Sequence, residues 1–299
     1  MSNTKHFLSV SDYSKAEILE IFKLAGELKE LQKNKEEHTK LKGKTLAMIF
    51  QKPSNRTRLS FEVGMYQLGG QAVNIREEEI GMGVRESIPD VARTISRYVD
   101  AVMIRANKHT DILKLAEFAT VPVINGLSDR YHPCQAMADL MTILEYKDSF
   151  DGLKLCYIGD GNNVARSLIK ICNILGVKIV ICSPPGYGPK AEDTMGSEVF
   201  SDPYIAAKDA DVIYTDVWAS MGQENNKEKR LKDFKNYTVN MNIMAQAKRN
   251  AIFMHCLPAH RGEEVENEVI ESKYSVVFDQ AENRMHVQKG ILLFLLEDK

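Results

Sequence analysis

The chain has 299 residues, of which 44% are hydrophobic, and its 39 basic and 41 acidic side chains give a formal net charge of −2. This length suffices for two domains with a core each, and the balanced charge excludes a general nucleic-acid or polyanion binder, which needs a basic face. No apolar run reaches the roughly 18 residues of a membrane-spanning helix. The N-terminal segment MSNTKHFLSVSDYSKAE lacks the features of a signal or transit peptide, so we expect a cytoplasmic protein.

The five cysteines show no paired spacing, and their number is odd. Three of them, Cys156, Cys172 and Cys182, lie in apolar stretches, where a reduced core thiol is the expected state. Neither a disulfide framework nor a zinc site is indicated by the positions of Cys134 and Cys256.

Helical and strand patterns alternate along the chain. Ser14 and Glu17 form a capping-box pattern ahead of apolar residues at helical spacing, which predicts a first helix. Short apolar runs predict strands, in chain order KTLAMIF (44–50), 71–75, AVMIR (101–105), VPVIN (121–125), KLCYIG (154–159), KIVICS (178–183), DVIYTD (211–216), AIFMHC (251–256) and SVVFD (275–279). Helical patterns separate most of these runs, for example 87–98, 133–147 and 162–175, and a final helix is expected over 281–296.

This alternation indicates the fold class. Strands rich in Val and Ile that are buried on both faces and alternate with helices are typical of parallel α/β sheets. Nine strands are better divided between two sheets than placed in one, and the polar segment EYKDSFDG (145–152) is the candidate boundary. We therefore predict two domains, 1–147 and 148–280, each a parallel β-sheet flanked by helices. The C-terminal helix, about 281–299, is expected to pack back on the first domain.

The segment KPSNRTRLSFE (52–62) joins the first predicted strand to a helix. In parallel sheets, ligands bind at the carboxyl ends of strands, where helix N-termini present free N–H groups. The hydroxyls of Ser54 and Thr57 and the guanidiniums of Arg56 and Arg58 could surround a phosphate there, since guanidinium donates two parallel hydrogen bonds. The alternative is a solvated basic helix start with Ser54 as its N-cap. The GxxxxGK[ST] pattern of a P-loop is absent, so a nucleoside triphosphate is not the expected ligand.

Two further polar residues lie at or after the ends of predicted strands. His132 precedes Pro133, a residue that suits the first position of a helix. From there it could donate to a carbonyl oxygen that gains negative charge, although a structural role is the alternative. Arg105 ends AVMIR and is either an anion ligand or an edge residue whose charged head reaches water.

The second half of the chain carries two more loops with polar residues after strands. YIGDGNNVARSL (157–168) resembles a dinucleotide-binding loop only weakly, because the third glycine is missing and no acid ends the next strand. Asn162 and Asn163 could instead hold a carboxylate at the helix start. In DVWASMG (216–222), Asp216 could bind a substrate ammonium, with Ser220 beside it.

Cys256, in HCLPAHRGEEV (255–265), is the one cysteine outside a plain core context. His255 and His260 are near it in sequence, so a nucleophilic role is one interpretation. Because neighbouring residues of a strand point to opposite faces, His255 is poorly placed to activate the thiol. A positioning or electrostatic role is the better interpretation, and a buried thiol is the alternative.

These motifs together resemble the ornithine carbamoyltransferases. The resemblance covers nearly the whole chain in one fixed order: SNRTRLSFE, VMIRA, HPCQAMADL, GDGNN, DVWASMG, HCLPAHRGEE and AENR. Aspartate carbamoyltransferase shares the phosphate motif and the HP.QA segment but typically lacks the SMG and HCLP pair. The resemblance implies carbamoyl transfer from carbamoyl phosphate to the δ-amine of L-ornithine, giving L-citrulline and phosphate, without a metal or organic cofactor. It also implies a homotrimer or a multiple of trimers.

The resemblance implies roles for single residues. Carbamoyl phosphate would contact Ser54, Asn55, Arg56, Thr57, Arg105, His132, Gln135, Cys256, Leu257 and Arg284. L-Ornithine would contact Asn163, Asp216, Ser220 and Met221. The catalytic set would be Arg105, His132, Asp216 and Cys256. In the implied reaction a neutral amine attacks directly, and donors stabilise the oxyanion of a tetrahedral intermediate. Arg58 is expected to support the fold and the loop.

Two residues depart from the family pattern. Asn55 stands where threonine is usual, although its amide can still donate a hydrogen bond. Gly81 stands where many members carry a polar side chain, often glutamine, in a loop directed at a neighbouring subunit.

Three alternative functions are kept. One is a sister carbamoyltransferase that acts on putrescine or an N-acylornithine, and another is a catalytically silent binding protein of the same fold. An NAD oxidoreductase is the third. A panel of amine acceptors distinguishes the sister carbamoyltransferases from an ornithine carbamoyltransferase. Citrulline formation by the purified protein would rule out the silent binding protein. A change in nicotinamide fluorescence on mixing would indicate the oxidoreductase, and we expect none.

Overall fold

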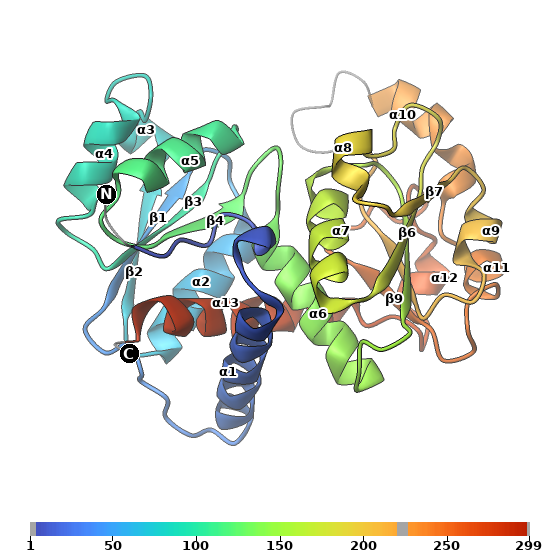
Figure 1. Cartoon of the computed structure of the whole chain (residues 1–299), viewed down its shortest axis with the longest axis horizontal. Coiled ribbons are helices and arrows are strands. Elements are labelled where there is room, and N and C mark those ends of the chain that lie inside the picture. The colour runs from blue at the N-terminus through green and yellow to red at the C-terminus, as the bar shows by residue number, and fades with distance from the viewer. Residues whose placement is uncertain (1–3, 220–226, 298–299) are drawn as a thin grey trace. The chain divides into compact units, whose positions relative to one another are not determined.

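The computed structural model describes residues 4–219 and 227–297 (Figure 1). The chain forms two compact units: unit 1 is Met1–Ala138 with Asn283–Lys299, and unit 2 is Asp139–Glu282. The chain passes from unit 1 to unit 2 within α6 (Pro133–Lys147) and returns within α13 (Val277–Leu296). Each unit contains one parallel sheet with helices around it, so the predicted fold class is confirmed.

Unit 1 is built on a four-stranded sheet with the order β2-β1-β3-β4. The strands are β1 (Thr45–Phe50), β2 (Gln71–Arg76), β3 (Ala101–Arg105) and β4 (Val123–Leu127), and every pair is parallel. Phe50 at the end of β1 is in register with Arg76 on one side and with Arg105 on the other. Three strands therefore end at the same level, and the loops that follow them begin at one edge of the sheet.

Helices cover both faces of this sheet (Figure 1). On one face α4 (Ile88–Ile95) and α5 (His109–Phe118) pack on apolar side chains of β1 and β3. On the other lie α2 (Asn55–Gln67), α1 (Lys15–Lys33) and the C-terminal part of α13. A Cβ on Gly290 of α13 would lie 2.8 Å from the carbonyl oxygen of Ile21 in α1. The C-terminal helix thus packs closely on the first unit, as predicted.

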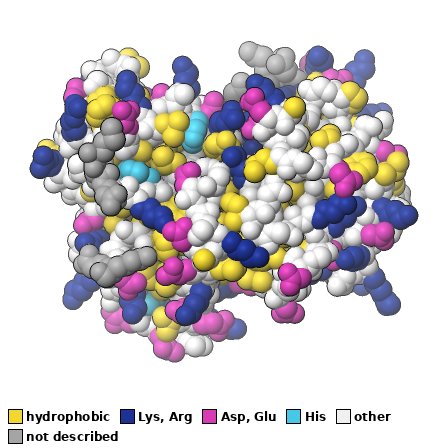
Figure 2. All heavy atoms as spheres, in the orientation of Figure 1, with side chains coloured by type: hydrophobic (Ala, Val, Ile, Leu, Met, Phe, Trp, Pro, Cys, Tyr) yellow, Lys and Arg dark blue, Asp and Glu magenta, His cyan; other side chains and the backbone are white. Residues whose placement is uncertain are grey.

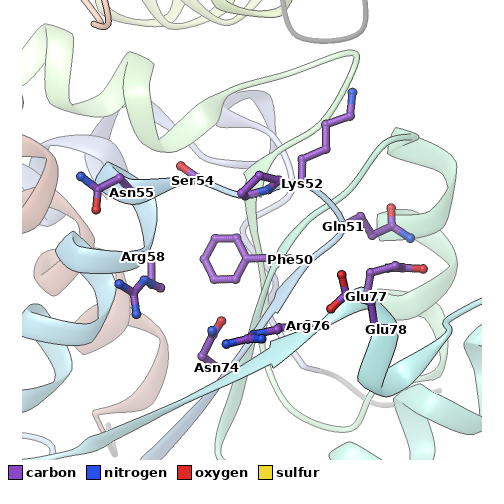
Figure 3. A pocket seen from close by; sticks show the side chains of 11 residues that line it. Phe50, Gln51, Lys52, Ser54, Asn55, Arg58, Asn74, Arg76, Glu77 and Glu78 are labelled. Atoms are coloured by element: carbon purple, nitrogen blue, oxygen red, sulfur yellow. The ribbon is translucent and has the colours of Figure 1, made fainter.

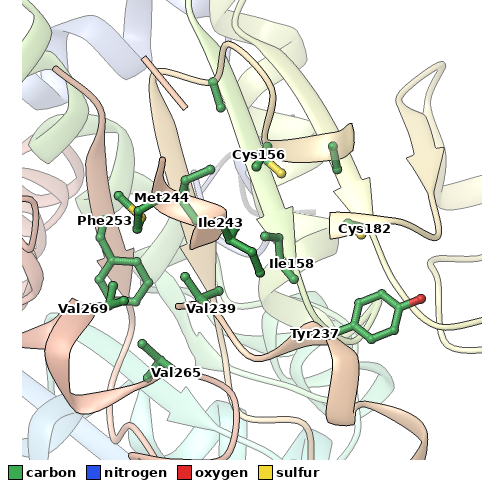
Figure 4. Close-up of a cluster of buried hydrophobic side chains, with 14 of the residues drawn as sticks. Cys156, Ile158, Cys182, Tyr237, Val239, Ile243, Met244, Phe253, Val265 and Val269 are labelled. Atoms are coloured by element: carbon green, nitrogen blue, oxygen red, sulfur yellow. The ribbon is translucent and has the colours of Figure 1, made fainter. Parts of the chain in front are cut away.

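Unit 2 has a five-stranded parallel sheet with the order β7-β6-β5-β8-β9. Its strands are β5 (Lys154–Ile158), β6 (Lys178–Cys182), β7 (Glu198–Phe200), β8 (Val212–Thr215) and β9 (Ile252–His255). The helices are α7 (Asn163–Leu175), α8 (Ala191–Thr194), α9 (Pro203–Ala207), α10 (Lys227–Asp233), α11 (Met241–Met244) and α12 (Asn267–Ile270). Figure 4 shows strand residues such as Ile158 and Phe253 packed with Ile243, Met244 and Val269 in one buried cluster.

One strand prediction is wrong, and one strand was not predicted. SVVFD (275–279) is not a strand, because α13 begins at Val277 and only Ser275 forms an isolated bridge, to Phe253. A short apolar run does not distinguish a buried strand from the buried first turn of a helix. The strand β7 was not predicted, since it has three residues and two of them, Glu198 and Val199, are exposed. The other eight predicted strands and the capping box of Ser14 and Glu17 are confirmed.

The surface agrees with the balanced composition. On the face in Figure 2, basic and acidic side chains are interspersed, and neither sign covers a broad area. Within the described ranges, no helix combines the length and the apolar character that crossing a bilayer requires.

Candidate active site

The loop after β1 places Ser54 beside Arg105. Ser54 occupies the N-cap position of α2, but its side chain makes no capping hydrogen bond. Its Oγ instead accepts a hydrogen bond from Nη1 of Arg105 at 3.3 Å. The shared register of β1 and β3 explains this contact, since both strands end at the same level. The alternative interpretation is therefore met in part, since Ser54 is the N-cap residue of α2 by position and Arg56 and Arg58 are exposed, but the Ser54 hydroxyl contacts Arg105 and does not cap the helix.

Arg284 of α13 organises a second set of contacts in unit 1. Its Nη1 donates to Oε1 of Gln135 at 2.5 Å, and its Nη2 donates to Oγ1 of Thr57 at 3.3 Å. All three side chains are buried. Residues from α2, α6 and α13, far apart in sequence, are thus brought together.

Burial and like charges dominate the electrostatics of this cluster. Burial, with smaller effects from the charges of Arg284 and Arg56, lowers the pKa of Arg105 to about 10. Burial and the charges of Arg284, Arg105 and Arg56 also lower the pKa of His132 well below its usual value. His132 is therefore neutral at pH 7 and can donate one N–H without being an acid. An anion bound between the buried guanidiniums of Arg105 and Arg284 would stabilise both charges.

Arg105 gives the clearest sign of an anion-binding position. The residue is 6% exposed, and its Nε is buried without a hydrogen-bond partner among the described residues. A buried guanidinium N–H that donates to no acceptor costs free energy, because it has lost its water and gained nothing in exchange. A bound phosphate oxygen would remove this cost.

A cavity of about 560 Å³ lies next to the same helix start. Figure 3 shows Ser54 and Asn55 on one side of it and Arg58, Asn74 and Arg76 on the other. Glu77 and Glu78 also line it, and their negative charge opposes the binding of an anion. The cavity is lined by neither Thr57 nor Arg105. We therefore regard the buried cluster around Arg105, rather than this cavity, as the better phosphate site.

The backbone explains the glycine at position 81. Gly81 ends the short helix α3 (Glu77–Ile80) with a φ of 56°, and its N–H donates to the carbonyl oxygen of Glu77 at 2.7 Å. A Cβ at this position would lie 2.8 Å from Cβ of Arg85. Because a side chain here would be both strained and crowded, glycine suits this turn. Asn55, the other departure, is the exposed first residue of α2.

In unit 2, Asn162 in the loop after β5 contacts Asp216, the residue that follows β8. Oδ1 of Asn162 accepts from two backbone N–H groups in the first turn of α7, and its Nδ2 donates to Oδ2 of Asp216 at 2.7 Å. The other oxygen of Asp216 accepts from the Cys256 thiol at 3.0 Å. The Asn162 side chain therefore positions the Asp216 carboxylate and the first turn of α7. The resemblance assigns the contact with L-ornithine to Asn163, which is half-buried.

His255 is not a base for the neighbouring thiol. The His255 ring is fully buried, and its Nδ1 accepts a hydrogen bond from the backbone N–H of Leu257 at 2.8 Å. Nε2 then carries the proton and donates to Oε1 of Glu264 at 3.0 Å. The prediction that His255 is poorly placed to activate Cys256 is confirmed, because both of its ring nitrogens contact other partners. The thiol of Cys256 donates to the Asp216 carboxylate and receives no help from His255 as a base, which favours a positioning role over covalent catalysis.

A buried polar network that sequence reasoning missed supports the end of β9. Oε1 of Gln280 accepts from the His255 backbone N–H at 2.9 Å, and Nε2 of Gln280 donates to Oδ1 of Asp139 at 2.7 Å. The hydroxyl of Tyr214 donates to the other oxygen of Asp139 at 3.1 Å. These residues are widely separated in sequence and form no local pattern, so no sequence signal could have joined them.

The remaining predicted residues fall into three cases. Ser220 and Met221 lie outside the described residues. Cys256 and Leu257, which the resemblance assigns to carbamoyl phosphate, belong to unit 2. The cysteines Cys134, Cys156, Cys172 and Cys182 are free and buried, and burial raises the pKa of each thiol.

Two groups of potential metal ligands occur among the described residues. In each group the ligand atoms lie within 4.8 Å of one another: Asp216 with His255 and Cys256, and His260 with Glu263 and Glu264. In the first group both ring nitrogens of His255 already make hydrogen bonds, so a metal ion there would have to break one of them.

Comparison with known proteins agrees with this arrangement. Residues 5–145 match the family model described as "Aspartate/ornithine carbamoyltransferase, carbamoyl-P binding domain", and residues 151–295 match its "Asp/Orn binding domain". The chain is 52% identical over 303 residues to an ornithine carbamoyltransferase of Anoxybacillus flavithermus, covering 98% of this chain and 96% of the relative. Identity to the anabolic ornithine carbamoyltransferase of Pyrococcus furiosus is also 52%, with the same coverage.

Solved structures of ornithine carbamoyltransferases are also similar to this chain. The ornithine carbamoyltransferase from Pyrococcus furiosus superimposes with a TM-score of 0.94 at 51% identity and covers 99% of this chain and 98% of its own. The ornithine carbamoyltransferase from Thermus thermophilus superimposes with a TM-score of 0.89 at 41% identity, and the match covers 97% of this chain and 98% of that one.

Proposed function

Because the chain belongs to the aspartate/ornithine carbamoyltransferase family, we propose that it transfers the carbamoyl group of carbamoyl phosphate to the δ-amine of L-ornithine. The products are L-citrulline and phosphate. The observation that carries this proposal is the 52% identity, over 98% of the chain, to relatives named as ornithine carbamoyltransferases. Residues 1–147 with the C-terminal helix would form the carbamoyl phosphate-binding domain, and residues 148–280 the ornithine-binding domain.

The cluster in unit 1 is assigned to carbamoyl phosphate. Its phosphate is held by Ser54, Asn55, Arg56, Thr57 and Arg105, and Gln135 and Arg284 complete the site. The lowered pKa of Arg105 supports this assignment, because burial and like charges destabilise the protonated guanidinium until a dianion is bound. Backbone N–H groups at the start of α2 add positive dipoles to the same site.

The chemical step requires a neutral amine and donors for an oxyanion. A free amine of this kind has a pKa of about 10.4, so the site must favour its deprotonated form. Neutral His132, with Thr57 and Arg105, donates to the carbamoyl oxygen as it becomes an oxyanion. Losing one such donor typically lowers turnover by roughly 10²–10³. Formation of the C–N bond moves the C=O π electrons onto the oxygen. When the C=O bond re-forms, the bond from carbon to the phosphate oxygen breaks, phosphate leaves with that electron pair, and the amine proton passes to phosphate or solvent.

Unit 2 is assigned to L-ornithine. Asn163, Asp216, Ser220 and Met221 hold the amino acid, and the Asp216 carboxylate binds the ammonium group that stays charged. Its two oxygens are already fixed by Asn162 and Cys256, so the carboxylate is preorganised for this role. Cys256 and Leu257 are assigned to the reacting end, with Cys256 as a positioning residue.

The test is a colorimetric citrulline assay on the purified protein with L-ornithine, putrescine and N-acetylornithine side by side. We expect product with L-ornithine and at most trace product with the other two amines. Product with putrescine or N-acetylornithine alone would replace the proposed substrate, and no product with any amine would favour a binding protein.

A cytoplasmic location and a homotrimer, or a multiple of trimers, are further parts of the proposal. Light scattering on the purified protein measures the mass of the oligomer. A mass of one or two chains of 33.8 kDa each would contradict it.

A further inference from the structure

The turn after β9 brings three potential metal ligands together. His260, Glu263 and Glu264 each direct one ligand atom to the same place, and these atoms lie within 4.8 Å of one another. The N–H of Glu263 donates to the carbonyl oxygen of His260 at 2.8 Å, which closes a four-residue turn. Gly262 takes the third position with a φ of 89°, as a type II turn requires. This turn places His260 and Glu263 close to the carboxylate that follows.

Glu264 gives an independent sign of a ligand. The residue is 0% exposed, and its Oε1 accepts hydrogen bonds from the backbone N–H of His260 at 2.6 Å and from Nε2 of His255 at 3.0 Å. Its Oε2 is also buried but has no hydrogen-bond partner among the described residues. This oxygen lies 3.9 Å from Nδ1 of His260. A buried carboxylate oxygen that receives no donor is unfavourable, and a cation at this point would remove the cost.

We propose that His260 Nδ1, Glu263 Oε2 and Glu264 Oε2 bind a divalent transition-metal ion of the Zn²⁺ class. One imidazole with two carboxylates suits such ions, whereas Mg²⁺ and Ca²⁺ prefer oxygen ligands alone. Zinc–ligand bonds of about 2.0–2.2 Å place tetrahedral ligand atoms roughly 3.3–3.5 Å apart. His260 Nδ1 and Glu263 Oε2 are already 3.4 Å apart. The side chains of His260 and Glu263 are 45% and 29% exposed, so water has access to the fourth position.

The basic side chains that the structure describes around this turn leave the site available to a cation. Nζ of Lys227 lies 3.2 Å from Glu263, but it contacts Oε1 and not the oxygen assigned to the metal. Arg261, the nearest basic residue in sequence, pairs with Glu271 at 2.6 Å. The hydrogen bond from His255 to Oε1 of Glu264 fixes the carboxylate, as outer-shell partners of metal ligands commonly do.

The same hydrogen bonds connect the metal site to the candidate active site. His255 donates to Glu264 through one ring nitrogen and accepts from the Leu257 backbone through the other. An ion on Glu264 therefore acts on a carboxylate that positions His255 and, through it, the turn that carries Leu257. The proposal of a metal site itself does not depend on the proposed carbamoyl transfer.

The test is a Zn²⁺ titration of the metal-free, full-length protein in competition with a chromophoric chelator. It is done in a Cys256→Ser background, because this substitution removes the thiol of the other ligand group. We expect one Zn²⁺ per chain in that background, and Co²⁺ should give the visible absorption of a nitrogen- and oxygen-ligated site. Adding His260→Ala or Glu263→Gln should weaken Zn²⁺ binding at least as much as the roughly 10- to 100-fold seen for loss of outer-shell partners.

The matched control is Glu268→Gln, which removes an exposed carboxylate of α12 outside the group and should leave the affinity unchanged. His260 and Glu263 are partly exposed, so both variants are expected to fold, and thermal melts check this. The proposal is overturned if the Cys256→Ser protein binds no Zn²⁺, or if the folded His260→Ala and Glu263→Gln variants bind it as tightly as their parent.

Discussion

The polar sites of the two units have opposite electrostatic character. In unit 1, Arg105 is buried among like charges, and its Nε has no acceptor among the described residues. In unit 2, Asp216 is buried and held by neutral donors, the Asn162 amide and the Cys256 thiol, with no ion pair among the residues that the structure describes. Asp160, by contrast, is paired with Arg230 at 3.0 Å. The difference indicates that one unit is prepared for an anion and the other for an ammonium group.

The largest expected effect is that of Arg105→Gln. The substitution removes a donor for both the phosphate and the oxyanion, and kcat/KM for carbamoyl phosphate should fall by at least roughly 10²–10³. The melting temperature should not fall, because the repulsion between the buried charges of Arg105 and Arg284 is removed. Steady-state kinetics and thermal melts measure the two effects.

Arg58→Gln is the matched control for this prediction. Arg58 is exposed and lies 3.7 Å from Glu62, so its loss should change activity little. If Arg58→Gln were the more damaging substitution, the phosphate site would have to be moved to the cavity that Arg58 lines.

Asp216→Asn should affect the other unit selectively. The amide keeps the shape but loses the charge, and a hydrogen bond to a charged group contributes about 1.5–3 kcal/mol, or roughly 10- to 150-fold in affinity. The KM for L-ornithine should rise within this range, while that for carbamoyl phosphate should change by a much smaller factor. Equal changes in both constants would remove Asp216 from the amino-acid site.

The smallest expected effect concerns the pH dependence of stability. Burial lowers the pKa of His132 in the folded state, so below the usual histidine pKa the unfolded chain binds more protons than the folded one. The free energy of unfolding should therefore fall with decreasing pH, by at most about 1.4 kcal/mol per pH unit from this residue. Urea unfolding of the wild type and of His132→Asn between pH 7.5 and 5 isolates this contribution. The prediction fails if the two slopes are the same, or if His132 titrates by NMR in its ordinary range.

The sequence predicted elements well where a pattern is local and long. The α6 helix begins and ends where its pattern does, at Pro133 and Lys147, because apolar spacing and the proline both act within one segment. The run at 275–279 was misread because its three consecutive apolar residues, 276–278, fit a strand and a buried helical turn equally well. Strand β7 was missed because it has only three residues and no buried side chain, so its sequence shows no apolar run.

The candidate site residues were predicted on other grounds than the helices and strands. The composition of the loop at Ser54 and the arginine at the end of β3 indicated an anion site, but only the resemblance to a family joined Arg284 to Thr57 and Gln135. The bond from Asn162 to Asp216 spans 54 positions, and the pair of Asp160 and Arg230 spans 70. Such contacts depend on the order of strands in the sheet, which residue spacing does not encode.

The central claim is that the buried cluster around Arg105 binds the phosphate. A crystal structure with phosphonoacetamide, a stable analogue of carbamoyl phosphate, tests it most directly. We predict that the phosphonate contacts Ser54 and Arg105 and that the amide oxygen accepts a hydrogen bond from His132. Density for the analogue in the cavity lined by Arg58, Asn74 and Arg76, with none at Arg105, would contradict the claim.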